Sequence, residues 1–270
     1  MAELRPKYID IHPQYDQTGY KVTNETVTIF DKLLEGRKRF GKVGCIASGG
    51  EVWLASLLPR AKELFAVDHS YAALLCSYGK AVLLSQLGPS GFRELLKTKT
   101  HQEFDALLKS VAPEELRTKI KIGYGWTVGD HDEALRVWAT IPDEALAASA
   151  KKIDKVTLIH GDLSDIEKYG PFDVAYVSNA FEHTGRDGYE KRPSLNNLPP
   201  LKNRAIVLST HAKAPMTPIT QEWDLCGKHD LGQWSHVLYR RKRVKKAAVL
   251  PEVAGAILTD QQGVTNAAHV

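Results

Sequence analysis

The chain has 270 residues, of which 43% are hydrophobic and 25% charged, and its formal net charge is +4. This composition excludes a disordered or fibrous chain and supplies apolar material for one sizeable core. No apolar run approaches the roughly 18 residues of a membrane-spanning helix, and the first residues lack the apolar stretch of a signal peptide, so we expect a cytoplasmic protein. Three widely spaced cysteines predict free thiols and no disulfide framework: Cys45, Cys76 and Cys226.

Short runs of β-forming residues alternate with helical patterns along the chain. Helices are expected at 25–34, 51–58 and 70–87, and strands at 43–47, 64–67, 156–160, 174–177 and 206–209. Such alternation predicts an α/β fold with a doubly wound, mostly parallel sheet. A late strand is expected at 237–244, where an edge position would tolerate its charges.

The expected helices and strands also suggest how the chain is divided. Residues 88–154 contain helical patterns at 92–96, 104–111 and 134–148, which is more than a simple crossover requires. They predict a helical insertion, either over the open end of the sheet or packed on one face. We therefore expect residues 1–40 to form an N-terminal cover with a helix and several tyrosines, residues 41–250 the α/β domain with its insertion, and residues 251–270 a tail.

The sequence IASGGE at 46–51 marks the first strand-to-helix turn, which in a doubly wound sheet lies at the ligand cleft. Ser48, Gly49 and Gly50 would let the backbone approach a ligand, because glycine lacks a Cβ and adopts positive φ. Glu51 places a negative charge where a phosphate loop leaves a helix N-terminus free for an anion. The dinucleotide and P-loop glycine patterns are absent, so the turn favours a cationic or hydroxyl-rich ligand.

Two acids follow later strands of the predicted sheet. Asp68 ends the second strand, where a carboxylate commonly accepts hydrogen bonds from ribose hydroxyls. Asp162 follows the third strand and could meet an adenine amino group. For both residues the alternative role is to cap a helix, because aspartate is also a preferred N-cap residue.

The turn and its two acids resemble the class I S-adenosylmethionine-dependent transferases over about residues 43–209. In detail, IASGGE, AVD, Lys80 in the next helix, QLGPSGFRELL and FDVAYVSNAFEH are similar to the betaine-lipid-type 3-amino-3-carboxypropyl transferases. The resemblance implies a Rossmann-like class I methyltransferase fold that binds S-adenosyl-L-methionine. It also implies that Ser48, Gly49 and Glu51 line the amino-acid end of the cofactor, Asp68 its ribose and Asp162 its adenine. The full candidate set for the cofactor is Ser48, Gly49, Gly50, Glu51, Asp68, His69, Asp162, Ser178 and Asn179.

The polar segment SNAFEHTGRDGYEKR follows the fourth predicted strand and supplies the candidate catalytic residues Asn179, Glu182 and His183. Any of them could orient or deprotonate an acceptor, and histidine titrates near neutral pH without strong tuning. The alternative is a solvated polar loop. In the insertion, Tyr124 and Trp126 could face a sulfonium cation or anchor their loop into the core.

Three functions remain open from the sequence. Transfer or cyclisation of the 3-amino-3-carboxypropyl group would release methylthioadenosine, whereas methyl transfer to a small molecule would release adenosylhomocysteine. A non-catalytic nucleotide- or RNA-binding protein is the alternative from another class. We expect a small-molecule acceptor, no stable nucleic-acid partner and no metal, because Cys226 and His229 make only half of a zinc site. One charge run is either a solvated strand end or a weak contact for anionic surfaces: Arg240, Arg241, Lys242, Arg243, Lys245 and Lys246.

Overall fold

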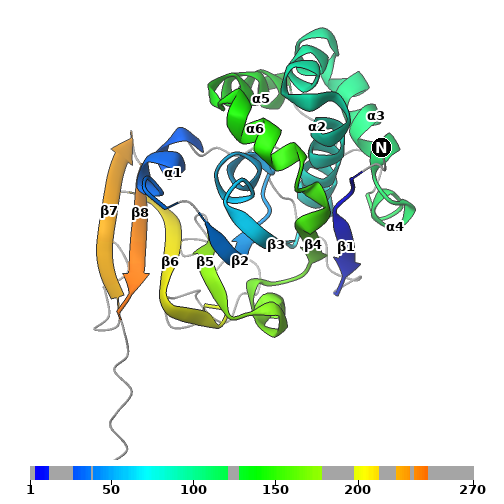
Figure 1. Ribbon diagram of the computed structural model, residues 1–270. Coiled ribbons are helices and arrows are strands. Elements are labelled where there is room, and N and C mark those ends of the chain that lie inside the picture. Colours follow the sequence, from blue (N-terminus) through cyan, green and yellow to red (C-terminus); the bar gives the residue numbers. More distant parts are fainter. Residues whose placement is uncertain are drawn as a thin grey trace, which may run out of the picture.

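The computed structural model describes residues 4–11, 27–37, 39–120, 128–177, 198–212, 223–231 and 234–242. These residues form an eight-stranded sheet in the order β1-β4-β3-β2-β5-β6-β8-β7 (Figure 1). The strands are β1 Lys7–Asp10, β2 Phe40–Ile46, β3 Ala61–Asp68, β4 Val156–His160, β5 Phe172–Tyr176, β6 Leu201–Ala212, β7 Trp223–Leu231 and β8 Trp234–Arg241.

The strand order confirms the doubly wound sheet predicted from the sequence. From the central β2, the chain forms β3 and then β4 on one side before it crosses to β5 and β6 on the other. All pairs from β1 to β6 are parallel, while β8 is antiparallel to both β6 and β7. The order of the parallel strands reverses at the central β2, and an antiparallel strand is inserted beside one edge of the sheet. This is the strand order of the Rossmann-like class I methyltransferase fold. The topological switch point therefore lies at the carboxyl end of β2.

Both edges of the sheet differ from the sequence-based prediction. The late strand expected at 237–244 begins earlier, as β8, and lies between two strands instead of at an edge. The edge is β7, which we did not predict, because WDLCGKHDL has charges and a glycine in place of an alternating apolar pattern. An edge strand tolerates such a sequence, since one of its sides forms no ladder. At the opposite edge β1 adds a strand where only a cover was expected.

The helices lie mainly on one side of the sheet (Figure 1). Ser70 caps α2, as predicted, by accepting a hydrogen bond from the N–H of Ala73 at 3.2 Å. The helix runs past its expected end because a kink at Gly88, with φ of 67°, leads into a second segment that starts with Pro89. Helices α3 and α6 pack against α2. The α-helices are α1 Val27–Leu33, α2 Tyr71–Thr98, α3 His101–Val111, α4 Glu114–Arg117, α5 Val128–Thr140 and α6 Asp143–Ala150.

The helix expected at 51–58 widens into a π-helix, η1, at Trp53–Leu57. The N–H of Leu58 donates to the carbonyl of Trp53 at 2.8 Å, one residue further back than in an α-helix. The Leu54 carbonyl that this shift releases accepts the hydroxyl of Ser149 from α6. Ser149, which is far away along the chain, therefore stabilises the wider turn. The spacing of apolar residues within the helix could not predict this π-helix.

The two faces of the sheet bury separate apolar clusters. Alternate residues of the strands, such as Val43, Cys45, Leu64 and Leu158, join the cluster beneath α1, η1 and α2. The residues between them, such as Phe65, Val67 and Ile159, pack with the 3₁₀-helix η3 Leu163–Tyr169 on the other face. Cys45 and Cys76 are buried and Cys226 is exposed, and none of the three forms a disulfide bond, as predicted. Within the described ranges, no helix is both long and apolar enough to span a membrane.

Candidate functional site

The turn after β2 is packed so closely against α2 that position 50 requires glycine. Ser48 and Gly50 adopt left-handed backbone conformations, with φ of 47° and 97°. A Cβ on Gly50 would come within 3.2 Å of the Cα and Oγ of Ser77 in α2. The Ser77 hydroxyl also donates to the Ser48 carbonyl at 2.9 Å. The positive φ expected of the glycines thus falls at Ser48 and Gly50, and not at Gly49, and the turn is held as a rigid element.

Glu51 is paired with Lys80 from α2, so the negative charge expected at the start of the helix is not open. Both side chains have no exposed surface. The Lys80 ammonium donates to the Glu51 carboxylate and, at 2.9 Å, to the Gly49 carbonyl. A buried charge requires such a partner. The expectation that the charge of Glu51 favours a cationic ligand at this turn therefore loses its basis, because Lys80 offsets that charge.

Asp68 joins the ends of β2 and β3 at the switch point. Its carboxylate accepts hydrogen bonds from the backbone N–H of Ser48 at 2.9 Å and of Ser70 at 3.0 Å. Burial raises the pKa of this carboxyl to about 6, although hydrogen bonds from backbone N–H groups and the nearby His160 act to lower it. At neutral pH the side chain is mostly ionised, and it fixes the glycine turn against the turn that follows β3.

His69 and Asp162 face each other beyond β3 and β4. The Nε2 of His69 lies 3.7 Å from a carboxylate oxygen of Asp162, so the two form an ion pair when the histidine is protonated. Asp162 also caps η3 by accepting from the N–H of Ser164 at 3.2 Å. The capping alternative is therefore correct for Asp162. A contact between this residue and an adenine stays a prediction.

A buried histidine that the sequence analysis missed connects the N-terminal strand to this site. His160, at the end of β4, has its Nε2 2.9 Å from the His69 carbonyl oxygen and its Nδ1 3.0 Å from a carboxylate oxygen of Asp10. Because a carbonyl only accepts, Nε2 carries a hydrogen and donates it. The Tyr71 ring stacks on His160 with ring centroids 3.7 Å apart, and its hydroxyl donates to Asp10 at 3.0 Å. No sequence signal pairs Asp10 with His160, because they lie in strands far apart along the chain.

The predicted residues that follow β5 lie outside the described part of the chain: Ser178, Asn179, Glu182 and His183. The same holds for Tyr124 and Trp126. The strand that leads into the first group is described, and its register places Tyr176 beside Cys45 of β2. The chain therefore leaves β5 next to the strand whose end carries the glycine turn. The roles of these residues stay predictions.

Cys226 and His229, the half of a zinc pattern, both lie on the edge strand β7. In the ranges that the structure describes, no group of three or more histidine, cysteine or acidic side chains could hold a metal ion. The described site contains charged side chains and backbone groups, and these are the groups available to a ligand there.

No protein-family model matches the chain, and no curated protein matches it. Solved structures with a similar arrangement include the rRNA methyltransferase aviRa from Streptomyces viridochromogenes, with 13% identity and a TM-score of 0.44 over 83% of this chain and 88% of that chain. The ribosomal protein L11 methylase from Lactobacillus delbrueckii subsp. bulgaricus shows 12% identity and a TM-score of 0.42 over 82% of this chain and 81% of that chain. At such low sequence identities and TM-scores, these structures carry no argument about this protein. The assignment of the fold rests on the strand order, and the proposal of a function rests on the geometry of the site.

Proposed function

We propose that this protein is an S-adenosylmethionine-dependent transferase that moves or cyclises the 3-amino-3-carboxypropyl group and releases methylthioadenosine. The observation that carries the proposal is the hydrogen bond from the Ser48 N–H to Asp68. It joins a rigid glycine turn to a strand-terminal acid at the switch point of a doubly wound sheet, where such sheets bind ligands. This is the pair of features that a nucleoside needs, with a close backbone on one side and an acceptor for ribose hydroxyls on the other.

The described residues fit such a cofactor. An ionised carboxylate has about four acceptor positions, and backbone N–H groups do not fill all of those on Asp68. At least one position remains for a ribose hydroxyl. His69 and Asp162 lie on the side of the site where the resemblance places the adenine. When bound, the cofactor supplies a carbon made electrophilic by the positive sulfur, so the protein has to align the acceptor and exclude water.

Gly49, Glu51 and Lys80 support the narrower assignment. These residues carry part of the resemblance to the aminocarboxypropyl transferases, and they contact one another in a single buried cluster. Because Glu51 is engaged by Lys80 and has no exposed surface, we assign it a positioning role. It holds Lys80, and Lys80 fixes the carbonyl of Gly49 in the turn.

In the proposed reaction a lone pair of the acceptor attacks the chain carbon bonded to sulfur. The carbon–sulfur bond breaks and its electron pair stays on sulfur, which becomes a neutral thioether in methylthioadenosine. In cyclisation the attacking nitrogen belongs to the same chain. In both cases the nucleophile loses a proton, and Asn179, Glu182 and His183 are the candidates that would orient the nucleophile or take the proton. Methyl transfer with release of adenosylhomocysteine is the alternative on the same site.

Identification of the nucleoside product tests the proposal. The protein is incubated with S-adenosylmethionine, with and without a mixture of small amines and alcohols, and the nucleosides are identified by mass. Methylthioadenosine above the level formed without protein supports the aminocarboxypropyl assignment, and adenosylhomocysteine supports methyl transfer. The proposal of a transferase fails if neither product forms and calorimetry detects no binding of S-adenosylhomocysteine.

Asp68→Asn should weaken the binding of S-adenosylhomocysteine by about 1.5–3 kcal/mol, the range for hydrogen bonds to a charged group. The two backbone N–H groups use different oxygens of Asp68, so asparagine keeps an acceptor for one of them and turns its amide NH2 toward the other. Some loss of stability is therefore expected as well, and a cooperative thermal transition must show that the variant folds. Calorimetric titration measures the affinity, and Asp154→Asn, which changes an exposed carboxylate outside the site, is the matched control. Unchanged affinity in a folded Asp68→Asn protein would remove this residue from the site.

The raised pKa of Asp68 predicts opposite pH trends for stability and for binding. Its folded-state pKa of about 6 lies above the ordinary value of 3.8. As the pH rises from about 4 to about 6, the unfolded chain therefore loses this proton first, and the contribution of Asp68 to the free energy of unfolding falls. Ionisation also creates the charged acceptor for ribose, so the affinity for S-adenosylhomocysteine should rise between about pH 5 and about pH 7. Titrations at several pH values should show this rise in the wild type and not in Asp68→Asn, and an equal rise in both would contradict the prediction.

A further inference from the structure

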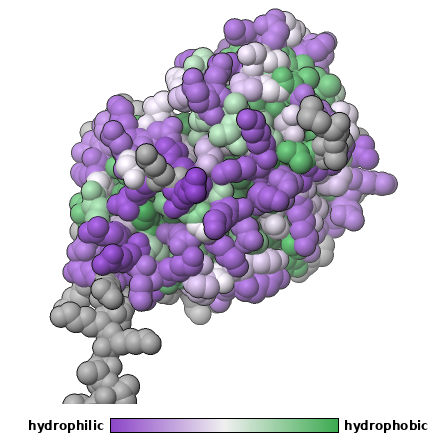
Figure 2. Space-filling view, in the orientation of Figure 1, coloured by the Kyte–Doolittle hydropathy of each residue, from purple (hydrophilic) through white to green (hydrophobic). Residues whose placement is uncertain are grey.

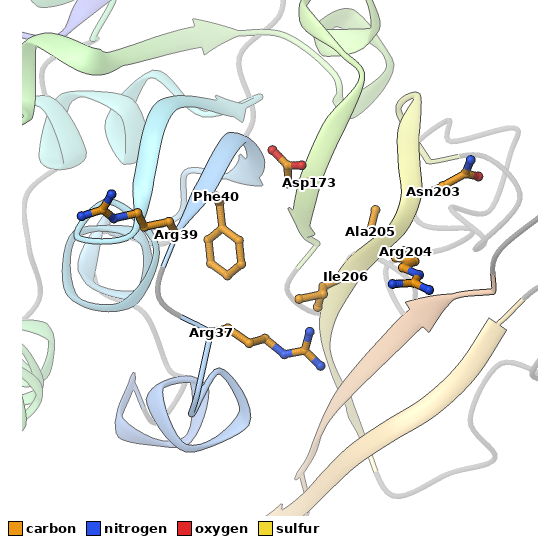
Figure 3. Close-up of a pocket in the computed structure, with 8 residues that line it drawn as sticks. All are labelled: Arg37, Arg39, Phe40, Asp173, Asn203, Arg204, Ala205 and Ile206. Carbon is orange, nitrogen blue, oxygen red and sulfur yellow. The ribbon is translucent and has the colours of Figure 1, made fainter.

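A hollow lies at the opposite end of the sheet from the glycine turn, and Figure 3 shows the residues that line it. It has a volume of about 250 Å³, and its lining comes from the residues before β2 and from the starts of β2, β5 and β6. Phe40, Ala205 and Ile206 form its buried apolar lining. Because these positions are at the amino ends of parallel strands, a ligand there would not overlap a cofactor at their carboxyl ends.

Three arginines line this hollow: Arg37, Arg39 and Arg204. Figure 3 shows the Arg37 side chain below Ile206 and Arg204 on the other side of Ile206, whereas Arg39 points away from them. Within the described ranges no ion pair joins any of the three to a carboxylate. Guanidinium groups gathered without a counter-ion repel one another, and a bound anion would remove that repulsion.

The carboxylate in the lining, Asp173, is already engaged. It accepts hydrogen bonds from the backbone N–H groups of Gly41 and Lys42, at 2.8 and 2.9 Å. It also forms an ion pair with Lys202 at 2.9 Å. The Lys202 ammonium offsets the charge of Asp173, so the arginines give the hollow a net positive charge.

Arg204 is held in an unusual backbone conformation that directs this part of β6. Its φ of 65° lies in the left-handed region, which arginine rarely adopts. The pairing of β6 with β5 is interrupted here, because the register passes from Leu201 opposite Phe172 to Ile206 opposite Val174. The extra residues form a bulge, and bulges commonly re-aim side chains at functional sites.

Further cations surround the same end of the sheet. Arg240 pairs in register with Ile206, so the last residues of β8 lie beside the start of β6. Arg241 donates to the carbonyl of Leu201 at 3.1 Å. Figure 2 shows hydrophilic residues over the lower ends of β7 and β8. Arg240 and Arg241 therefore add positive charge near the start of β6, close to the hollow.

We propose that the hollow between Arg37 and Arg204 binds a phosphate group. Guanidinium groups bind phosphate oxygens through paired, charge-assisted hydrogen bonds, and two of them on opposite sides can hold one phosphate. The group belongs either to a small phosphorylated compound or to the backbone of RNA, and these two sources share the same chemistry. The site is separate from the proposed cofactor site and does not depend on its assignment.

The test compares Arg37→Gln/Arg204→Gly with the wild type and with the control Lys97→Gln/Lys151→Gln, which removes two exposed lysines outside this hollow. Glycine adopts the backbone of Arg204 without strain, so that change removes the cation and preserves the bulge. Arg204→Gly alone serves as a second variant. Inorganic pyrophosphate, followed by calorimetry, and a single-stranded RNA oligonucleotide, followed by fluorescence anisotropy at several salt concentrations, are the probes.

The arginine variant should lose about tenfold or more in affinity, as expected for hydrogen bonds between charged groups. For RNA the slope of log K against log salt should also become shallower by about 0.7, because the variant loses its contact with one phosphate. If the arginine variant loses pyrophosphate binding and keeps RNA binding, the site is supported and its phosphate belongs to a small compound. If the variant loses RNA binding and keeps pyrophosphate binding, the phosphate belongs to RNA. The proposal is overturned if neither probe binds the wild type, or if the arginine variant binds both probes as well as the control does.

Discussion

Replacement of Lys80 by methionine is expected to lower the free energy of unfolding by about 3–5 kcal/mol, because it leaves the buried Glu51 carboxylate without its cation. Both side chains lack exposed surface, so water cannot replace the lost partner. The Gly49 carbonyl loses its hydrogen bond to the ammonium in the same variant. Methionine keeps an unbranched chain of similar length, so the effect reports the lost charge more than a cavity. Denaturation in urea at neutral pH measures the difference.

Two further variants distinguish the loss of a buried ion pair from the loss of an exposed charge. Glu51→Gln/Lys80→Met has no uncompensated buried charge, and most of the lost stability should return. Lys99→Met removes a partly exposed ammonium that lies 3.7 Å from Glu103, and exposed pairs of this kind contribute at most about 1 kcal/mol. If Lys80→Met cost no more than Lys99→Met, Glu51 would have to be neutral in the folded protein, and the assignment of a charged pair would fail.

The double variant Glu51→Gln/Lys80→Met also tests whether the stability of the fold and the affinity of the site can change independently. It should fold, but Lys80 would no longer fix the Gly49 carbonyl. Affinity for S-adenosylhomocysteine should therefore stay below that of the wild type after stability has recovered. Stability thus follows the balance of buried charge, whereas binding follows the geometry of the turn.

The central strands could be predicted because their signal is local. Buried parallel strands read as apolar runs, and β4 has the predicted bounds, Val156–His160. Asp68 could be found for a related reason, since a strand end in a doubly wound sheet has a known relation to the cleft. The edge strands have no such run. β1 consists of only four residues, and charges interrupt β7.

Contacts between residues that are far apart along the chain could not be predicted from the sequence. Glu51 and Lys80 were both recognised, but their contact depends on how α2 packs over the glycine turn, which no local pattern encodes. Asp10 and His160 meet only because β1 pairs with β4. The widened turn at Trp53–Leu57 likewise depends on Ser149 from α6. Local sequence patterns therefore predict where the strands of the candidate site end, while packing determines which of its side chains are paired with one another.

β5 ends at a defined place beside the proposed site. β5 pairs with β2 through Cys45 opposite Tyr176, and the N–H of Val177 donates to the Leu208 carbonyl of β6 at 3.0 Å. β5 therefore ends between β2 and β6, and β2 separates it from β3, the strand that carries Asp68. An acceptor must approach to about 3–3.5 Å from the carbon that it attacks, so the groups that orient it belong at this rim. Gly49, Glu51 and Lys80 supply a carbonyl and a closed ion pair, and neither is a base open to solvent.

At least one of the single variants Asn179→Ala, Glu182→Ala and His183→Ala should therefore lower turnover about a hundredfold or more, the lower end of the contribution of a positioned acid–base group. The affinity for S-adenosylhomocysteine should change far less, because the ribose contact is assigned to Asp68. Rates of methylthioadenosine or adenosylhomocysteine formation at saturating cofactor measure turnover, calorimetry measures affinity, and Asp154→Ala is the control. If all three variants keep wild-type turnover, the segment is a solvated loop, and the group that handles the proton must be sought in residues 121–132 or among the N-terminal tyrosines.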